Sequence, residues 1–213
     1  IFVRIKFAGI YGLMTKLIAS FFFILLAIVA NTNNPNQFGA LIITGLVIGL
    51  IGDAFLDLRQ IDEKNRSPYT RAGMLAFSIG HIPFIYAITN DAAFSPQMFG
   101  IATATSLIFA AVAISLEKPL KLHYGNFRAL SFVYGFILAT MTACAIIAAL
   151  NFDFQNMRYN ILSLAGVLFI ISDLILSTIY FDKAQNKHTP INIFTNHVTY
   201  YTAQFLIASS IMF

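Results

Sequence analysis

Long apolar stretches separated by short polar gaps dominate this chain and limit what it can fold into. A membrane-spanning helix needs about 20 mostly apolar residues, and seven stretches meet or approach that length. They are Gly12–Ala30, Phe38–Leu58, Ala72–Thr89, Gln97–Leu116, Arg128–Leu150, Asn160–Phe181 and Ile193–Phe213. None of the gaps is long enough for a soluble domain. The sequence therefore predicts an all-α, polytopic transmembrane helical bundle of seven spans, with residues 1–213 forming a single transmembrane domain.

The composition supports this fold class and argues against a nucleic-acid partner. Hydrophobic residues make up 58% of the chain and charged residues only 10%, whereas soluble domains are about 25% charged. The net charge is +4, but the basic residues lie mostly in the short gaps between spans. Basic residues in such loops are topology signals rather than a nucleic-acid surface.

The distribution of Lys and Arg predicts the orientation in the membrane. If the seven spans alternate, twelve of the 13 basic residues, including Arg4 and Lys6, lie on one side and only Arg158 lies on the other. Cytoplasmic loops carry the excess of Lys and Arg. We therefore expect the N-terminal end of this chain in the cytoplasm and the C-terminus outside. The short loops favour a bacterial inner membrane.

Only a few ionisable residues lie within the predicted spans. They are Asp53, Asp57, His81 and Asp173. Each costs about 2.5–3.5 kcal/mol near the bilayer centre on insertion scales, so such residues usually serve function. No Lys or Arg is expected deep enough to neutralise the carboxylates, although Lys16 could reach toward them from the inner end of its span. Asp57 is expected to be solvated at the interface.

The predicted topology places the buried polar residues at a similar depth. Asp53 and Asp173 lie on spans that run in the same direction, and His81 lies on a return span. Tyr200, Tyr201 and Gln204 on the last span fall near the same level. The sequence thus predicts one polar chamber in the cytoplasmic half of the membrane.

A short internal similarity suggests two related halves. Gly52-Asp53-Ala-Phe-Leu56 resembles Ser172-Asp173-Leu-Ile-Leu176, and His81 follows Asp53 at the same spacing at which Tyr201 follows Asp173. Two four-helix halves related by a parallel repeat would place the two Asp on facing helices. In the second span, Gly45 and Gly49 at GxxxG spacing predict close helix packing at the bundle centre.

Several site types do not fit the sequence. The four His show no HxxxH or HExxH spacing and Cys144 is the only cysteine, so we expect no metal site. Ile193–Phe213 contains no Lys for a retinal Schiff base. No GxSxG nucleophile elbow or P-loop occurs. We expect no cofactor.

The two buried carboxylates allow two interpretations. Enclosed in one dry pocket they repel each other, so one should hold a proton while the other stays ionised, which provides an acid and a base for hydrolysis. Buried carboxylates also suit a proton relay, so the alternative is a small proton-coupled transporter using Asp53 and Asp173. An enzyme needs an apolar tunnel open to lipid, whereas a transporter needs access to both sides in turn. A receptor or scaffold would leave the cost of the buried carboxylates unexplained.

The order of several short motifs resembles the YhhN family of lysoplasmalogenases over nearly the whole chain. The matching elements are Thr15-Lys16, Gly52-Asp53-x-x-Leu56, the helix from Gly73 through Phe77 to His81, Tyr134 with Met141, Phe169-x-x-Ser172-Asp173-x-x-Leu176, and Tyr200-Tyr201-x-Ala203-Gln204-x-Leu206-Ile207. One departure is Leu17, which follows the Lys where the family usually has Pro. Members of the family have eight helices, so we expect that a first helix precedes this chain.

The resemblance implies hydrolysis of the vinyl ether bond of a lysoplasmalogen, a lysophospholipid drawn from the bilayer. The products would be a fatty aldehyde and glycerophosphoethanolamine or glycerophosphocholine. By analogy with glycosidases, the protonated member of the Asp53 and Asp173 pair would act as the acid and the ionised member would stabilise the cation and deprotonate water. The expected substrate-binding or positioning residues are Lys16, which could attract the phosphate, and His81, Tyr134, Ser172, Tyr200, Tyr201 and Gln204. The sequence specifies no oligomeric state.

Overall fold

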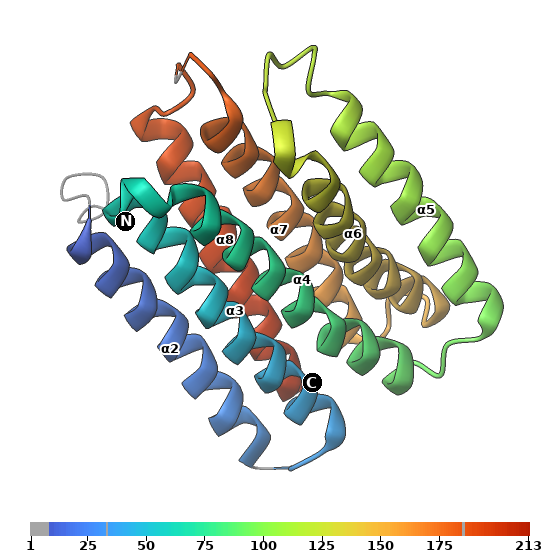
Figure 1. Ribbon diagram of the computed structural model, residues 1–213. Coiled ribbons are helices and arrows are strands. Elements are labelled where there is room, and N and C mark those ends of the chain that lie inside the picture. The colour runs from blue at the N-terminus through green and yellow to red at the C-terminus, as the bar shows by residue number, and fades with distance from the viewer. Residues whose placement is uncertain (1–8, 33, 185) are drawn as a thin grey trace.

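The computed structural model describes residues 9–32, 34–184 and 186–213. Its long helices are α2 (Ile10–Thr32), α3 (Gln37–Ile61), α4 (Arg66–Asp91), α5 (Pro96–Ser115), α6 (Arg128–Asn151), α7 (Met157–Phe181) and α8 (Pro190–Ser209). Single 3₁₀ turns lie at Glu63–Asn65, Gly125–Phe127 and Ser210–Met212. These helices form one antiparallel bundle with α2 and α5 at opposite edges (Figure 1). The predicted fold class is confirmed.

Six of the seven long helices in the described ranges are long and apolar enough to cross a membrane. The exception is α8, the seventh expected span, because polar residues such as Asn192, Asn196 and Gln204 interrupt its apolar sequence. Part of this polar face points into the bundle, where Asn196 and Gln204 are buried. The protein is therefore an integral membrane protein whose last helix owes part of its polarity to buried side chains.

The polar gap expected at Arg59–Arg71 is much shorter in the structure. Helix α3 continues to Ile61 and α4 begins at Arg66. Pro68 is compatible with this early start because the first-turn N–H groups of a helix have no intrahelical partner. Polar residues end the apolar part of a span without ending its helix.

Glycines allow α3 and α4 to pack closely, as the GxxxG spacing predicts. A Cβ at Gly45 would meet the Phe84 ring and lie 2.7 Å from the carbonyl oxygen of Gly80, and one at Gly52 would lie 2.8 Å from the ring of Phe77. Helix α3 also packs against α2 and α8. It therefore occupies the centre of its half of the bundle.

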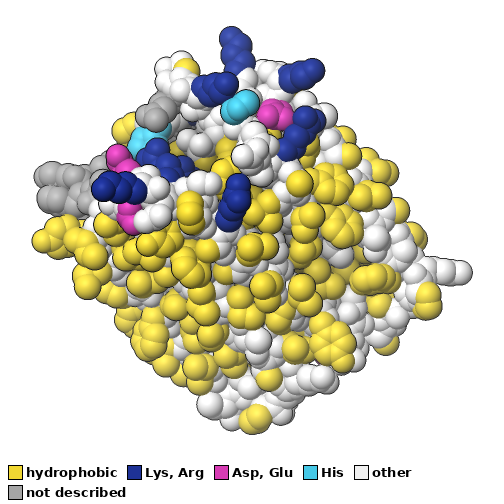
Figure 2. Space-filling model, viewed as in Figure 1, with side chains coloured by type: hydrophobic (Ala, Val, Ile, Leu, Met, Phe, Trp, Pro, Cys, Tyr) yellow, Lys and Arg dark blue, Asp and Glu magenta, His cyan; other side chains and the backbone are white. Residues whose placement is uncertain are grey.

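The basic residues of the described ranges gather at one end of the bundle. Dark blue side chains stand at this end in Figure 2, above a broad hydrophobic surface. We call it the basic end; it holds the C-terminal ends of α3, α5 and α7 and the N-terminal ends of α2, α4, α6 and α8. Arg158, at the start of α7, lies at the opposite end. Arg4 and Lys6, which the topology prediction counted, lie outside the described residues.

The helix pairing follows a repeated order. The contacts of α2 with α3, α3 with α4 and α4 with α6 recur as α6 with α7, α7 with α8 and α8 with α2. Asp53 is the 17th of the 25 residues of α3, and Asp173 is the 17th of the 25 residues of α7. Lys16 and Tyr134 are each the seventh residue of their helices, α2 and α6. These equivalent placements support the predicted repeat.

Candidate active site

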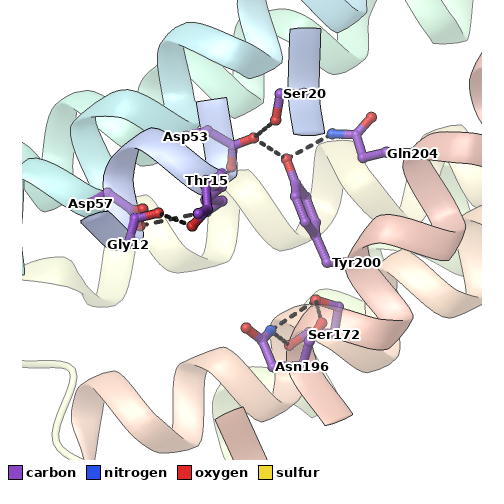
Figure 3. A network of polar contacts seen from close by, with 10 residues as sticks. Gly12, Thr15, Ser20, Asp53, Asp57, Ser172, Asn196, Tyr200 and Gln204 are labelled. Carbon is purple, nitrogen blue, oxygen red and sulfur yellow. Dashed lines mark hydrogen bonds and ion pairs between the residues drawn. The ribbon is translucent and has the colours of Figure 1, made fainter. Parts of the chain in front are cut away.

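Asp53 is the centre of a polar network inside the bundle. Its side chain is fully buried, and Oδ1 lies 2.7 Å from the ammonium nitrogen of Lys16. Its Oδ2 accepts hydrogen bonds from the hydroxyls of Ser20 and Tyr200, each at 2.6 Å. Figure 3 shows Ser20 and Tyr200 converging on this carboxylate from α2 and α8. Three helices thus meet at one buried negative charge.

Lys16 corrects two expectations from the sequence. It is only 8% exposed, and its ammonium reaches Asp53, as the sequence allowed, so the expectation that no cation would neutralise the carboxylates is wrong. Its long apolar stem carries the ammonium inward from the seventh position of α2. Asp57 was expected to be solvated, but it is 3% exposed and lies 3.8 Å from the same ammonium nitrogen. The buried ammonium of Lys16, which also pairs with Asp53 one turn earlier on α3, explains the burial of Asp57.

Tyr200 is held in place from two sides. The Gln204 side-chain amide donates a hydrogen bond of 2.8 Å to the Tyr200 hydroxyl, one turn along α8. The ammonium of Lys16 lies 5.1 Å from the Tyr200 ring centre, within cation–π range. The Tyr200 hydroxyl therefore donates a hydrogen bond to Asp53, while its oxygen accepts the hydrogen bond from Gln204.

Asp173 has a different environment. The Tyr134 hydroxyl of α6 donates a hydrogen bond to its Oδ2. No Lys or Arg of the described ranges lies within ion-pair distance of this carboxylate. Asp53 is thus paired with a cation, whereas Asp173 is not.

Both carboxylates line one cavity of about 460 Å³. Six of the nine predicted site residues lie on its wall, namely Lys16, Asp53, Tyr134, Ser172, Asp173 and Tyr200. Apolar side chains such as Phe77, Leu138 and Ile170 form much of the rest, and the wall extends to Phe109 of α5. At the basic end the cavity reaches the exposed residues Gln60 and His188. It can therefore accept an amphipathic molecule.

The other three predicted residues lie behind the wall. His81 is buried among aromatic rings, with its ring centre 4.9 Å from that of Phe169 and 6.1 Å from that of Tyr134. Its Nδ1 is 2.6 Å from the carbonyl oxygen of Phe77, and its Nε2 has no hydrogen-bond partner. Tyr201 packs against Tyr200, with ring centres 5.6 Å apart. These residues and Gln204 support the cavity wall rather than face the cavity.

Ser172 joins α7 to α8 beside Asp173. The Asn196 side-chain amide donates hydrogen bonds of 2.8 Å to both the carbonyl oxygen and the hydroxyl oxygen of Ser172. The Ser172 hydroxyl in turn lies 3.2 Å from the Asn196 carbonyl oxygen, and Figure 3 shows the pair below Tyr200. This contact fixes the register of the helix that carries Asp173.

Sequence reasoning missed several polar residues of the site. Ser20 lies one helical turn after Lys16 on α2, and this spacing on one face was the available signal. Asn196 lies one turn before Tyr200 on α8, also on one face. Arg59 and Tyr180 line the cavity toward the basic end, but their positions near helix ends resemble those of ordinary interface residues.

Among the residues that the structure describes, no group of three or more His, Cys, Asp or Glu could hold a metal ion. The carboxylates of Asp53 and Asp173 on the cavity wall are accompanied by the ammonium of Lys16 and the phenolic hydroxyls of Tyr134 and Tyr200, and the wall also carries guanidinium and imidazole groups. They can transfer protons and stabilise a developing positive charge.

Comparisons with known proteins point to one family. The model of the YhhN family matches residues 13–211. A protein of Dictyostelium discoideum named "Lysoplasmalogenase homolog" is 24% identical over 205 residues, which cover 84% of this chain and 65% of that protein. The chain thus spans somewhat less than two thirds of its relative. No solved structure matches.

Proposed function

Because the chain belongs to the YhhN family, we propose that it is a membrane-embedded lysoplasmalogenase. It hydrolyses the vinyl ether bond of a lysoplasmalogen and releases a fatty aldehyde and glycerophosphoethanolamine or glycerophosphocholine. The name of the Dictyostelium relative supports this substrate class. The basic end faces the cytoplasm in this proposal, in accordance with the excess of Lys and Arg there.

The observation that carries the proposal is the pair of unequal carboxylates on one cavity. Asp53 is fixed by an ion pair and two hydroxyl donors, so it holds the negative charge. Asp173 has a hydroxyl donor and no cation at ion-pair distance among the described residues, so it is the member able to hold a proton. Two carboxylates in opposite protonation states on one cavity provide a proton donor and a stabilising negative charge for the hydrolysis of an acid-labile ether.

The reaction follows from this assignment. Asp173 gives its proton to the β-carbon of the vinyl ether, and the electron pair of the double bond forms the new C–H bond. The ether oxygen shares its lone pair with the α-carbon, which produces an oxocarbenium ion. The negative charge of Asp53 and the carboxylate now present on Asp173 stabilise this cation electrostatically.

Water completes the reaction. A water molecule adds to the α-carbon while the Asp173 carboxylate takes its proton, which restores the acid and gives a hemiacetal. The hemiacetal hydroxyl then loses its proton, the glycerol oxygen gains one, and the C–O bond breaks to release the aldehyde. Asp53 is less suited to act as base, because its two oxygens already serve Lys16, Ser20 and Tyr200.

The walls of the cavity suit a single-chain lipid. The apolar side chains that extend from Phe77 to Phe109 can accept the hydrocarbon chain. Such a substrate resides in the bilayer, so it can enter the bundle sideways without crossing water. The steps above use only water and side chains of this chain.

The test is aldehyde release from lysoplasmenylethanolamine by the purified protein in detergent. Asp53→Asn and Asp173→Asn are assayed beside Asp153→Asn, an identical substitution at an exposed position at the opposite end. Asp153 has a φ of 48°, which Asn also adopts readily, so the control keeps its backbone. We expect release by the wild type and the control, and at least a thousandfold loss in both site variants.

No release from folded wild type across headgroups and pH would overturn the proposal. The proton-coupled transporter would then become the leading hypothesis, with the same two carboxylates as relay. Proton uptake into vesicles that depends on Asp53 and Asp173 would support it.

A further inference from the structure

Arg59 is a buried cation on the cavity wall that the hydrolytic steps do not use. It lies in the last turn of α3 and is only 8% exposed. Its guanidinium carbon lies 3.5 Å from the centre of the Tyr180 ring, so the planar group rests on the ring face. Both residues line the cavity that contains Asp53 and Asp173.

No carboxylate in the described ranges lies within ion-pair distance of Arg59. Asp182 also lines the cavity, but its two oxygens accept the backbone N–H groups of Ala184 and Lys187. Arg66 and His188, both exposed, line the same part of the wall. A buried guanidinium is costly without an anion, so this region is prepared to receive a negative group.

The spacing along the helices is of the same order as the distance between the vinyl ether and the phosphate of a lysophospholipid. Arg59 follows Asp53 by six residues on α3, a rise of about 9 Å toward the basic end. Tyr180 follows Asp173 by seven residues on α7, which is two turns along the same face. In a lysoplasmalogen the vinyl ether oxygen and the phosphorus are separated by five single bonds, which extend about 6 Å. A flexible guanidinium side chain can cover the remaining distance.

We propose that Arg59, stacked on Tyr180, binds the phosphate group of the lysophospholipid and sets its depth in the cavity. Phosphate binding selects substrates that carry a headgroup and places their vinyl ether between Asp53 and Asp173. Lys16 does not take this role, because its ammonium is held by Asp53 and Asp57. The substrate identity rests on the function proposed above, whereas the anion site rests on Arg59 itself.

The charge and the shape of the guanidinium both favour a phosphate. A guanidinium presents paired N–H donors that match two phosphate oxygens, and such charge-assisted bonds are stronger than neutral ones. A merely structural Arg59 would join α3 to α7 through the Tyr180 stack and interact with the C-terminal end of α3. Substitution of a merely structural Arg59 should affect the hydrolysis of all substrates equally, whereas substitution of a phosphate-binding Arg59 should affect only substrates that carry a phosphate.

The experiment compares two substrates that differ only in the phosphoethanolamine headgroup, which carries the phosphate. They are 1-alkenyl-glycerophosphoethanolamine and 1-alkenylglycerol, assayed with wild type, Arg59→Gln and Arg59→Lys. The matched control is Arg71→Gln, since Arg71 also stacks on a ring (Phe127, 5.4 Å) but is exposed and lies outside the cavity wall. We expect Arg59→Gln to raise KM about tenfold to a hundredfold for the phospholipid alone, with kcat nearly unchanged and a smaller rise for Arg59→Lys. An equal loss on both substrates, or no wild-type preference for the phospholipid, would overturn the proposal.

A binding measurement keeps this test separate from the hydrolase proposal. Protein in lipid nanodiscs is titrated with 1-hexadecyl-glycerophosphoethanolamine, which has no vinyl ether, and with 1-hexadecylglycerol. Weaker binding of the first ligand alone by Arg59→Gln supports the site even if wild type hydrolyses nothing, and unchanged binding overturns it. Displacement by millimolar inorganic phosphate would assign the site to free phosphate and overturn the headgroup assignment.

Discussion

Asp53 and Asp173 occupy equivalent positions in two halves of the bundle but have different partners. Each is the 17th residue of a 25-residue helix. The seventh residue of the preceding helix in each half contacts it, and this residue is Lys16 for Asp53 and Tyr134 for Asp173. One carboxylate therefore meets a cation and the other meets a neutral hydroxyl. The two halves thus give their carboxylates different chemical environments, because one equivalent position holds Lys16 in the first half and Tyr134 in the second.

The number of donors strengthens this difference. Asp53 also receives the hydroxyls of Ser20 and Tyr200, whereas Tyr134 is the donor to Asp173 in the described ranges. Three partners fix the orientation and the charge of Asp53. One partner leaves Asp173 able to exchange a proton with a substrate. The partners of the two carboxylates, rather than their location in the bundle, therefore distinguish their roles.

The largest expected effect is the loss of activity in both Asp→Asn variants, and the free energy of unfolding should distinguish the two. Both Asp→Asn variants should lose at least a thousandfold in kcat/KM, which corresponds to about 4 kcal/mol. Asp53→Asn should also lower the free energy of unfolding by about 3 kcal/mol, because the buried ammonium of Lys16 keeps only the more distant Asp57. Asp173→Asn should remain within about 1 kcal/mol of wild type. Unfolding in mixed detergent micelles measures the free energy of unfolding of both variants. Equal destabilisation of the two variants would contradict the assigned charges.

The second prediction tests the ion pair itself. Lys16→Met should destabilise the protein by about 3 kcal/mol, because it leaves the fully buried Asp53 charge without its cation. Adding Asp53→Asn to Lys16→Met should recover at least half of that loss without recovering activity, since the charge is then gone. The four proteins form a double-mutant cycle. Additive losses would show that Lys16 and Asp53 do not interact energetically.

The third prediction compares the two phenols. Tyr134→Phe removes the hydroxyl donor of Asp173 and should lower kcat about tenfold to a hundredfold by disturbing proton transfer. Tyr200→Phe leaves Lys16 and Ser20 on Asp53, so it should lower kcat less than tenfold. Aldehyde release at saturating substrate measures both variants. The reverse order would assign the acid to Asp53.

The hydropathy of the sequence was sufficient to predict the membrane fold and to select the two carboxylates that line the cavity. Apolar length identified six of the spans, and the insertion cost of charge singled out Asp53 and Asp173. It failed for Asp57, because hydropathy treats a residue near a span end as solvated. For Lys16 the sequence allowed a reach toward the carboxylates, and the structure shows its ammonium directed inward to Asp53 on another helix. Side-chain direction depends on which helices become neighbours, and a single sequence does not contain that information.

His81 illustrates a second limit of the sequence. A buried histidine was expected in the polar chamber, yet aromatic rings surround it and its Nε2 has no partner. A depth along the membrane normal does not specify which face of a helix a residue occupies. Gln204 shows the same limit, since it reaches the site only through Tyr200.

The smallest expected effect concerns the extra donor on Asp53. Ser20→Ala should lower the free energy of unfolding by about 1.5 kcal/mol, because it removes a buried hydrogen bond to a charged group. The matched control is Ser106→Ala on α5, where an equally buried hydroxyl bonds only to its own helix at Ala102. Its loss should be below about 0.5 kcal/mol, since a hydroxyl bonded within its own helix contributes little. If the two Ser→Ala variants are equally stable, Ser20 does not help to hold the Asp53 charge, and the contrast between the carboxylates then rests on Lys16 and Tyr200 alone.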